Sequence, residues 1–338
     1  MTAHQLPRLH YAYARHALVT ALRLVRIQPG ARVLIPEFIC RDVLASLRSV
    51  GAEPLFYEID DALQPRLSNA LQQSLNSLPQ PPAAIIAVNY FGFPAALERV
   101  QQLLPGRQVP IIEDNAHGWL SADSDGTPLG SRTQVGITSV RKTIRIPDGA
   151  FVEWRDDGTL DTRALHSPLE ARSESLPVSF RVRRTMARLD ARSPVAIMST
   201  ARSAIRLLRR VGGKPPVSDT AAEEWELPVH RNPHRESLNI MEQLDKSDEI
   251  ARRRTLFRRC EELAETFGVQ RPFPTLPKHV SPQGFPYFSS HTESLSEFTK
   301  AVRRHRIGED IAWPALPSGT SLSEHSRLRT LHLVNFLV

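Results

Sequence analysis

Short apolar runs alternate with segments of helix length over the first half of the chain. The runs that we expect to be strands are rich in Val, Ile, Leu and Ala and lie at residues 32–36, 54–60, 83–90 and 109–114. Residues 11–25 precede them, with Leu18, Leu22 and Val25 at the spacing of an amphipathic helix. Strands that are apolar along their whole length must be buried on both faces. The pattern therefore predicts an α/β fold with a mostly parallel central sheet and helices on both faces.

The second half of the chain follows a different pattern. We expect one long helix from about residue 236 to 267, whose apolar members are Leu238, Met241, Leu244, Ile250 and Leu263. The strand-like and helical segments after it predict a smaller α+β unit. The expected organisation is a large domain at residues 1–235 and a small C-terminal α+β domain at residues 236–338, which includes the long helix as a bridge between the two.

The formal net charge of the 338 residues is +7, which suits an anionic small molecule, a nucleic acid or a membrane surface as a partner. Much of the excess lies at residues 181–210, where arginines stand beside apolar residues at helical spacing. We interpret these arginines as the solvated faces of amphipathic helices, and residues 212–220 as an exposed linker. Because no nucleic-acid-binding motif accompanies them, we expect no nucleic-acid partner.

Composition also bears on location and on metal binding. No run approaches the roughly 18 to 20 apolar residues of a membrane-spanning helix, and the N-terminus has no apolar signal core, so we expect a cytoplasmic protein. Cys40 and Cys260 stand far apart, which excludes a disulfide scaffold, and Cys260 is expected to be a small buried hydrophobe. His230 and His234 are four residues apart, but Pro233 breaks the helix that a metal-binding pair would need, so no metal is expected.

Polar or reactive side chains follow three of the expected strands. Cys40, Asn89 and Asp114 each stand at or just beyond a strand end, and open parallel sheets collect ligands there. A carboxylate at the position of Asp114 can keep a pyridine nitrogen protonated. The pair Glu113–Asp114 would equally serve to cap a following helix, so this acid alone does not identify a cofactor.

Lys142 lies downstream, in S-V-R-K-T-I-R-I-P-D-G. Burial, or the neighbouring cations Arg141 and Arg145, favours the unprotonated amine that forms a Schiff base with an aldehyde. The competing interpretation is a row of surface cations. The apolar residues Ile144 and Ile146 and the closing Pro-Asp-Gly favour a buried turn. An acid and a lysine in this order suggest a site for pyridoxal 5'-phosphate (PLP).

Several ordered motifs make that suggestion specific. They read I-I-A-V-N-Y-F-G-F-P, I-I-E-D-N-A-H-G, G-T-P-L-G-S and S-V-R-K-T-I-R-I-P-D-G-A-F-V, with R-I-Q-P-G-A-R-V-L-I-P-E-F and S-V-G-A-E-P-L-F-Y-E-I-D upstream. In this order and spacing they resemble the DegT/StrS family of PLP-dependent sugar aminotransferases, over about residues 11 to 153. The resemblance implies the fold type I architecture of PLP-dependent transferases.

The resemblance also implies roles for individual residues. Lys142 matches the lysine that bonds covalently to the cofactor, Asp114 the partner of the pyridine nitrogen, and His117 the Gln/His position near the phenolic oxygen of PLP. Ser139 matches a serine that hydrogen-bonds the phosphate. Arg15 and His16 stand in the turn that opens a phosphate-binding helix in the family. Cys40 occupies the position of an aromatic ring over the cofactor, and Asn89 that of a polar residue after the third strand.

Some positions depart from the family pattern. Ala14 and Ala150 replace glycines, and Phe38 would have to supply the ring that Cys40 lacks. Asn232 and Arg235 are candidate counterparts of residues that a neighbouring subunit contributes. Trp313, followed by a proline, has the character of a core residue rather than a site residue.

The activity that the resemblance implies is transfer of an amino group from an amino acid, such as glutamate, to a keto-sugar. The sugar would be nucleotide-linked, the pathway glycan or polysaccharide biosynthesis, and the assembly a homodimer. Two alternatives remain open. One is PLP-dependent dehydration of a deoxysugar, which in the family replaces the lysine by histidine, so Lys142 argues against it. The other is a catalytically degenerate relative that acts as a PLP-binding or scaffolding subunit.

Overall fold

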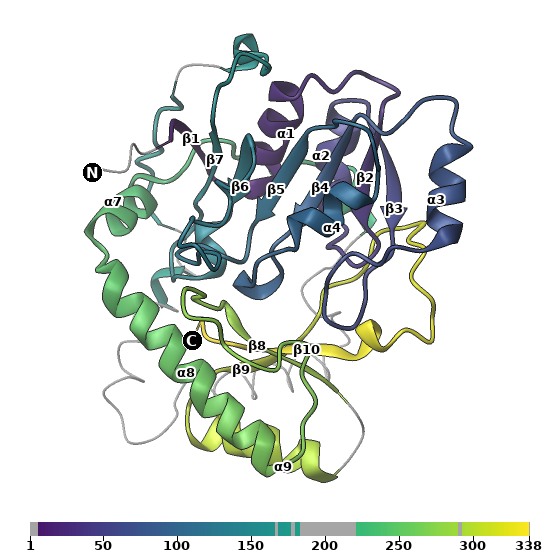
Figure 1. Ribbon diagram of the computed structural model, residues 1–338. Coiled ribbons are helices and arrows are strands. Elements are labelled where there is room, and N and C mark those ends of the chain that lie inside the picture. The colour runs from purple at the N-terminus through teal and green to yellow at the C-terminus, as the bar shows by residue number, and fades with distance from the viewer. Residues whose placement is uncertain (1–5, 166–167, 177–179, 183–220, 290–292, 338) are drawn as a thin grey trace.

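The computed structural model describes residues 6–165, 168–176, 180–182, 221–289 and 293–337 (Figure 1). Of the arginine-rich segment that we predict at residues 181–210, only Arg181 and Val182 fall within these ranges, and both are helical. The rest of that segment and the linker predicted at residues 212–220 lie outside the described residues. The described residues form two β-sheets. A large sheet holds the N-terminal half of the chain, and a small sheet is built by the C-terminal segment.

The large sheet has seven strands in the order β1-β7-β6-β5-β4-β2-β3. Their bounds are β1 Arg8–Tyr11, β2 Arg32–Pro36, β3 Glu53–Tyr57, β4 Ala84–Val88, β5 Ile111–Asn115, β6 Val135–Thr138 and β7 Ala150–Trp154. Within this sheet β7 alone runs against its neighbours, and β2 to β6 are parallel to one another. The predicted mostly parallel sheet is confirmed. Its strands β4 and β6 are buried at every position, as their continuous apolar runs require.

The helix that we predict over residues 11–25 begins later, because a strand precedes it. Residues Arg8–Tyr11 form β1, which pairs antiparallel with β7, so that Tyr11 lies opposite Ala150. Helix α1 then spans Ala14–Leu24. The edge pairing with a distant strand overrides the local helical pattern at Tyr11.

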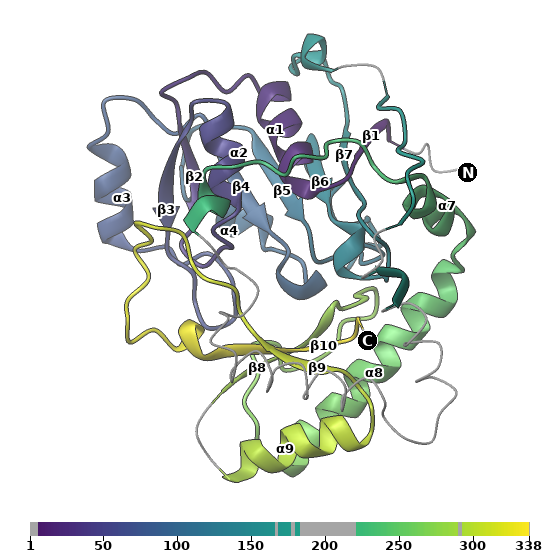
Figure 2. The same cartoon turned by 180° about the vertical axis from the view of Figure 1, so that it is seen from behind.

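Helices cover both faces of the large sheet. Their bounds are α1 Ala14–Leu24, α2 Val43–Ser49, α3 Asn69–Asn76 and α4 Leu97–Gln102. Figures 1 and 2 show α1 and α2 together over one face and α4 over the other, with α3 beside the β3 edge. Leu18 and Leu22 of α1 are buried, as their helical spacing predicts.

The single long helix that we predict at residues 236–267 is two helices. α7 spans Arg235–Gln243 and α8 spans Lys246–Thr266. The chain is extended at Leu244 and Asp245, and the Asp245 carboxylate accepts hydrogen bonds from the Ser247 and Asp248 N–H groups, which caps α8. The capping Asp245 therefore starts a new helix at a point where the apolar periodicity alone predicts one continuous helix.

The small sheet has three antiparallel strands in the order β8-β10-β9. They span Gly284–Phe288, Leu331–Asn335 and Glu309–Ala312, and α9 spans Glu293–Arg304. The turn that follows β4 lies against this sheet: the Gln283 N–H donates to Phe91 O at 2.9 Å. This contact puts the C-terminal segment next to the carboxyl ends of the large sheet.

Helix α8 packs its buried face against the same region. Phe257 lies 5.7 Å from Phe93, ring centroid to centroid, and Cys260 is fully buried, as expected. The other buried positions of α8 include Arg253, whose guanidinium donates to the backbone oxygens of Ser281 and Trp119. Among the helices that the structure describes, none has the length and apolar character needed to cross a bilayer.

Candidate active site

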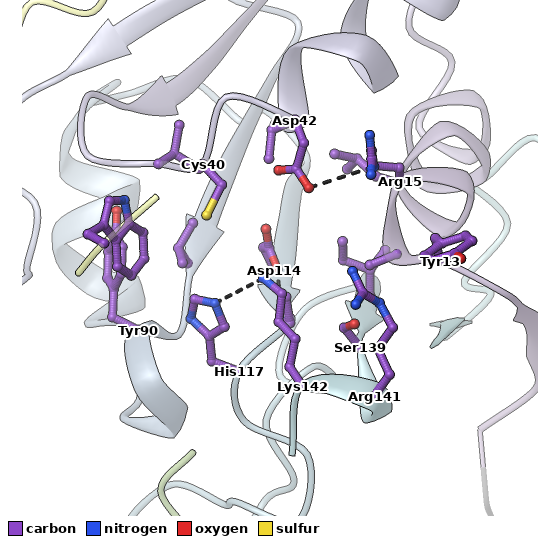
Figure 3. Close-up of a pocket in the computed structure, with 18 residues that line it drawn as sticks. Tyr13, Arg15, Cys40, Asp42, Tyr90, Asp114, His117, Ser139, Arg141 and Lys142 are labelled. Carbon is purple, nitrogen blue, oxygen red and sulfur yellow. Dashed lines mark hydrogen bonds and ion pairs between the residues drawn. The ribbon is translucent and has the colours of Figure 1, made fainter. Parts of the chain in front are cut away.

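A pocket with about 600 Å³ of empty space opens at the carboxyl ends of β4, β5 and β6 (Figure 3). Six of the eight predicted site residues line it, namely Arg15, Cys40, Asp114, His117, Ser139 and Lys142. They come from the start of α1, from the loop after β2, and from the ends of β5 and β6. Parallel strands present their carboxyl ends at one edge of the sheet, which is why residues so placed converge.

Lys142 and His117 contact each other inside the pocket. Lys142 ends a short 3-10 turn, η2 (Val140–Lys142), and its Nζ lies 3.1 Å from His117 Nε2. The other ring nitrogen, Nδ1, accepts from the Phe91 N–H at 3.4 Å, and the Phe91 ring stacks on the imidazole. A neutral imidazole has one donor and one acceptor, so a ring that accepts at Nδ1 carries its proton on Nε2, the nitrogen that faces the Lys142 amine. The unprotonated form of a lysine amine is the form that attacks an aldehyde.

Burial controls the charge of His117. The side chain lies almost wholly out of solvent, and burial holds the pKa of His117 well below its usual range, with a smaller contribution from the positive charge that Lys142 carries when protonated. The ring is therefore neutral at physiological pH. A neutral imidazole next to Lys142 can orient the amine without repelling it.

Asp114 lies near the end of β5 and is buried. Its Oδ1 accepts from the Ala116 N–H at 2.9 Å, and burial raises the pKa of Asp114, an effect that Lys142 and this hydrogen bond partly offset. Figure 3 shows the Asp114 and Lys142 side chains converging on the same space. Among the described residues the Ala116 N–H is the one hydrogen-bond donor to this carboxylate, which leaves it able to accept from a partner that brings its own N–H.

A second end of the pocket is rich in cations. Arg15, in the first turn of α1, pairs with Asp42 at 3.6 Å. Arg141 lies beside Ser139 in Figure 3, and its guanidinium carbon is 5.1 Å from the Tyr13 ring centroid. The helix begins without a side-chain cap, so the N–H groups of Ala14 and Arg15 are available to an anion.

The turn that carries Lys142 is anchored from behind by Asp148. This buried carboxylate, in the predicted Pro-Asp-Gly, accepts from Arg172 Nη2 at 2.7 Å, from Ser237 Oγ at 2.8 Å and from the His234 N–H at 3.0 Å. The network holds the segment between η2 and β7 against the start of α7. These hydrogen bonds explain why the Pro-Asp-Gly turn is buried, as the sequence predicts.

Trp313 was expected in the core, and it lines the pocket instead. It enters from the C-terminal segment just after β9 and stacks on Phe38, with ring centroids 4.5 Å apart. Its ring also meets His117 edge-on at 5.8 Å. The sequence predicts that Phe38 supplies the aromatic ring that Cys40 lacks. In the structure Phe38 is buried and does not line the pocket. Trp313 therefore adds an aromatic ring from a part of the chain that the sequence motifs did not indicate, whereas Tyr90, which also lines the pocket, lies within one of them.

Two predicted site residues do not line the pocket. His16 is buried against Pro228, with Nε2 2.9 Å from the Pro228 carbonyl oxygen. Asn89 donates to Glu113 at 2.8 Å and accepts from Arg132 Nη2 at 2.8 Å. Both side chains thus hold neighbouring segments together, because a buried polar group at a strand end is satisfied by whichever partner is nearest.

The candidates for a neighbouring-subunit role lie elsewhere too. Asn232 donates to the Glu170 backbone oxygen at 2.9 Å, and Arg235 opens α7. His234 caps that helix through Nδ1, and among the residues that the structure describes there is no cluster of three His, Cys, Asp or Glu side chains suited to a metal.

The side chains present fit the chemical groups of PLP. Lys142 offers an amine to an aldehyde, Asp114 a buried carboxylate to a ring N–H, and the cationic end a site for phosphate. The Nε of Arg141 is buried with no hydrogen-bond acceptor in the described part of the chain. An orphaned cationic donor at this end is consistent with an anionic ligand group.

Comparison with known proteins adds independent findings. The model of the DegT/DnrJ/EryC1/StrS aminotransferase family matches residues 11–166. A UDP-N-acetyl-3-dehydro-alpha-D-glucosamine 3-aminotransferase of Acidithiobacillus ferrooxidans is 29% identical over 123 residues, which are 36% of this chain and 32% of that protein. An arginine decarboxylase of Bacillus cereus is 30% identical over 123 residues, which are 34% of this chain and 27% of that protein. The match thus spans about a third of the length of these relatives.

A solved structure resembles the fold over nearly the whole chain. The DegT DnrJ EryC1 StrS aminotransferase from Brucella abortus superposes with a TM-score of 0.58 at 18% identity, covering 98% of this chain and 81% of that one. At this level of identity the likeness concerns the fold. It confirms the predicted fold type I arrangement.

Proposed function

We propose that this protein is a PLP-dependent aminotransferase that moves an amino group from an amino acid to a keto-sugar, since the model of the DegT/DnrJ/EryC1/StrS aminotransferase family matches residues 11–166. The observation that carries the proposal is the convergence of Asp114, His117 and Lys142 on one pocket, with the Lys142 amine 3.1 Å from His117. Each of these three side chains supplies a different group that the reaction requires.

The roles of the residues follow from their chemistry. When bound, PLP supplies an electron sink for negative charge at the α-carbon of an amino acid. Asp114 would keep the ring nitrogen protonated, and the Lys142 amine would hold the aldehyde and, once released, carry the α-proton at Nζ. Neutral His117 would orient that amine. Trp313, held by its stack on Phe38, would exclude water from the side of the pocket that faces the small sheet.

The substrate class is part of the proposal. The relative from Acidithiobacillus ferrooxidans is named for a nucleotide-linked keto-sugar, which supports a similar acceptor here, with glutamate as the donor. The net charge of +7 suits a diphosphate-linked substrate. We further propose a cytoplasmic homodimer that acts in glycan or polysaccharide biosynthesis. Lys142 favours amino transfer over the dehydration that the family links to histidine at this position.

The test is the absorption spectrum of the purified protein with PLP. We expect a band near the edge of the visible range, and Lys142→Ala should abolish it because no amine is left to bond the aldehyde. Lys142→Arg is the matched control, since it keeps the charge and loses the reactive amine; it should lack the band as well. A wild-type protein that shows no such band after incubation with PLP would contradict the proposal.

A further inference from the structure

Arg141 has an unusual environment for a charged side chain. It precedes Lys142 on η2, and its backbone N–H donates to Gly149 O at 3.2 Å, which fixes the main chain. Its side chain lines the pocket and lies near the Tyr13 ring. The Nε atom is buried, and no acceptor for it exists among the residues that the structure describes. A charged side chain thus lines the cavity with one buried donor that has no acceptor in this part of the chain.

The carboxylates that act on Arg141 electrostatically are Asp42 and Asp148, and both pair with other residues. Asp42 lies 3.6 Å from Arg15. Asp148 lies 2.7 Å from Arg172 and also accepts from Ser237. Arg15 and Arg141 therefore share this end of the pocket with one carboxylate between them, which leaves a positive charge in excess.

Leaving that charge unpaired is costly, because a buried ion loses its hydration. Burial lowers the pKa of Arg141, in keeping with this cost. An anion bound in the pocket would restore the lost interactions. The guanidinium fork matches the oxygens of a phosphate or a carboxylate in two parallel hydrogen bonds.

Two neighbours favour a phosphate. Helix α1 has 11 residues and begins at Ala14 with no side-chain cap, so the N–H groups of Ala14 and Arg15 can bind oxygen atoms, while that of His16 donates to the Tyr13 backbone oxygen at 3.1 Å. Ser139 adds a hydroxyl at the same end of the pocket. A group with three acceptor oxygens and nearly two negative charges can use all of these donors, whereas a carboxylate has only two oxygens.

We propose that Arg141 binds the phosphate group of PLP and supplies the charge that neutralises it. This inference rests on the proposed function. It assigns to Arg141 a binding role that is separate from its effect on Lys142. Under this proposal, residues 14–15, 139 and 141 of one chain together bind the phosphate.

The experiment measures the dissociation constants of PLP and of pyridoxal, which lacks the phosphate, for wild type and Arg141→Gln. We expect Arg141→Gln to weaken PLP binding by roughly 10- to 100-fold, the range for hydrogen bonds to charged groups, and to leave pyridoxal binding unchanged. Arg145→Gln is the matched control, because Arg145 is on the same loop and does not line the pocket. It should leave both constants unchanged.

A second readout needs no cofactor. Inorganic phosphate should raise the melting temperature of the wild-type apoprotein and raise that of Arg141→Gln much less, because a ligand stabilises the state that binds it. If Arg141→Gln weakens PLP and pyridoxal equally, or neither, the inference is wrong. If instead PLP binding survives and the affinity for glutamate falls, Arg141 binds the donor carboxylate and the inference is again wrong. A wild-type protein that binds neither aldehyde contradicts the proposed function itself.

Discussion

The two sides of the pocket are built differently. On one side, Asp114, His117 and Lys142 come from adjacent strands β5 and β6 and the turns that follow them, within one stretch of the chain. On the other side, Arg15, Cys40 and Trp313 come from α1, from the loop after β2 and from the segment after β9. The first side carries the ionisable groups that would act on the ring and the aldehyde. The second carries the start of α1, which would contact the phosphate together with Ser139 and Arg141, and the Trp313 ring.

The difference concerns how each side is held in place. The backbone of β5 and β6 is fixed by parallel pairing, with Asp114 opposite Ile137, so its side chains need little further support. Trp313 depends on packing against Phe38, a residue from the distant N-terminal half of the chain. We therefore expect substitutions of Asp114, His117 and Lys142 to affect chemistry, and substitutions on the second side to affect binding.

The largest effect is expected for Asp114→Asn. Asparagine cannot keep a pyridine nitrogen protonated, so kcat with glutamate should fall by about 100-fold or more. Because burial raises the pKa of Asp114, the charged form costs stability in the apoprotein, and the neutral variant should unfold at a temperature no lower than that of wild type. Stopped-flow turnover and thermal unfolding measure the two effects.

The matched control is Glu113→Gln, one residue earlier on β5. Glu113 is fully buried and lies 2.7 Å from Arg132, so its loss leaves a buried cation unpaired and should lower the free energy of unfolding by roughly 3–5 kcal/mol. Its effect on the chemical step should be small. If Glu113→Gln lowered kcat as much as Asp114→Asn, the distinction between the two acids would fail.

A smaller effect is expected for Trp313→Ala on the second side. Loss of the stack on Phe38 should weaken PLP binding by roughly 3- to 10-fold, the range for an aromatic pair, with little change in the rate of the chemical step. Trp313→Phe should retain most of the affinity. An unchanged dissociation constant for Trp313→Ala would show that the C-terminal segment is not part of the binding site.

The smallest effect is a dependence of stability on pH. The folded state holds the pKa of His117 below its ordinary value of 6.5, so below pH 6.5 the unfolded chain binds a proton that the folded chain does not. Stability is therefore full above pH 6.5 and is lost as the pH falls, by about 1 kcal/mol per pH unit. His10, whose pKa burial lowers to about 4, acts in the same direction.

Urea unfolding of the apoprotein between about pH 7.5 and 5.5, an interval that spans the ordinary pKa of histidine, measures this slope, and His117→Gln should reduce it. A wild-type stability that stays constant or rises as the pH falls over this interval would contradict the burial of a neutral His117. The difference in slope between wild type and His117→Gln isolates the strand-end side of the pocket, because His10 contributes equally to both proteins.

Much of the fold was predictable from the sequence because the strands of the large sheet are apolar along their length. The strand runs at residues 32–36, 83–90 and 109–114 correspond to β2, β4 and β5. β1 was missed, since its short segment alternates and is defined by its pairing with the distant β7. The break between α7 and α8 was missed because it depends on one capping residue, Asp245.

The candidate site divides in the same way. Asp114, His117 and Lys142 lie in ordered motifs at strand ends, so local sequence indicates them. Trp313 has no such motif, and only the folding of the small sheet onto the large one brings it into the pocket. Asn89 was placed correctly along the chain, yet its side chain turns to Glu113 and Arg132, a choice that depends on tertiary neighbours.

Amino transfer from glutamate is the activity that we propose for this protein. The most direct measurement mixes the PLP-loaded protein with glutamate, without an acceptor, and quantifies 2-oxoglutarate. We predict about one equivalent per site from the wild type and none from Lys142→Ala. PLP bound by wild type with no oxo-acid formed from glutamate or any other amino acid would contradict the claim and indicate a PLP-binding subunit without turnover.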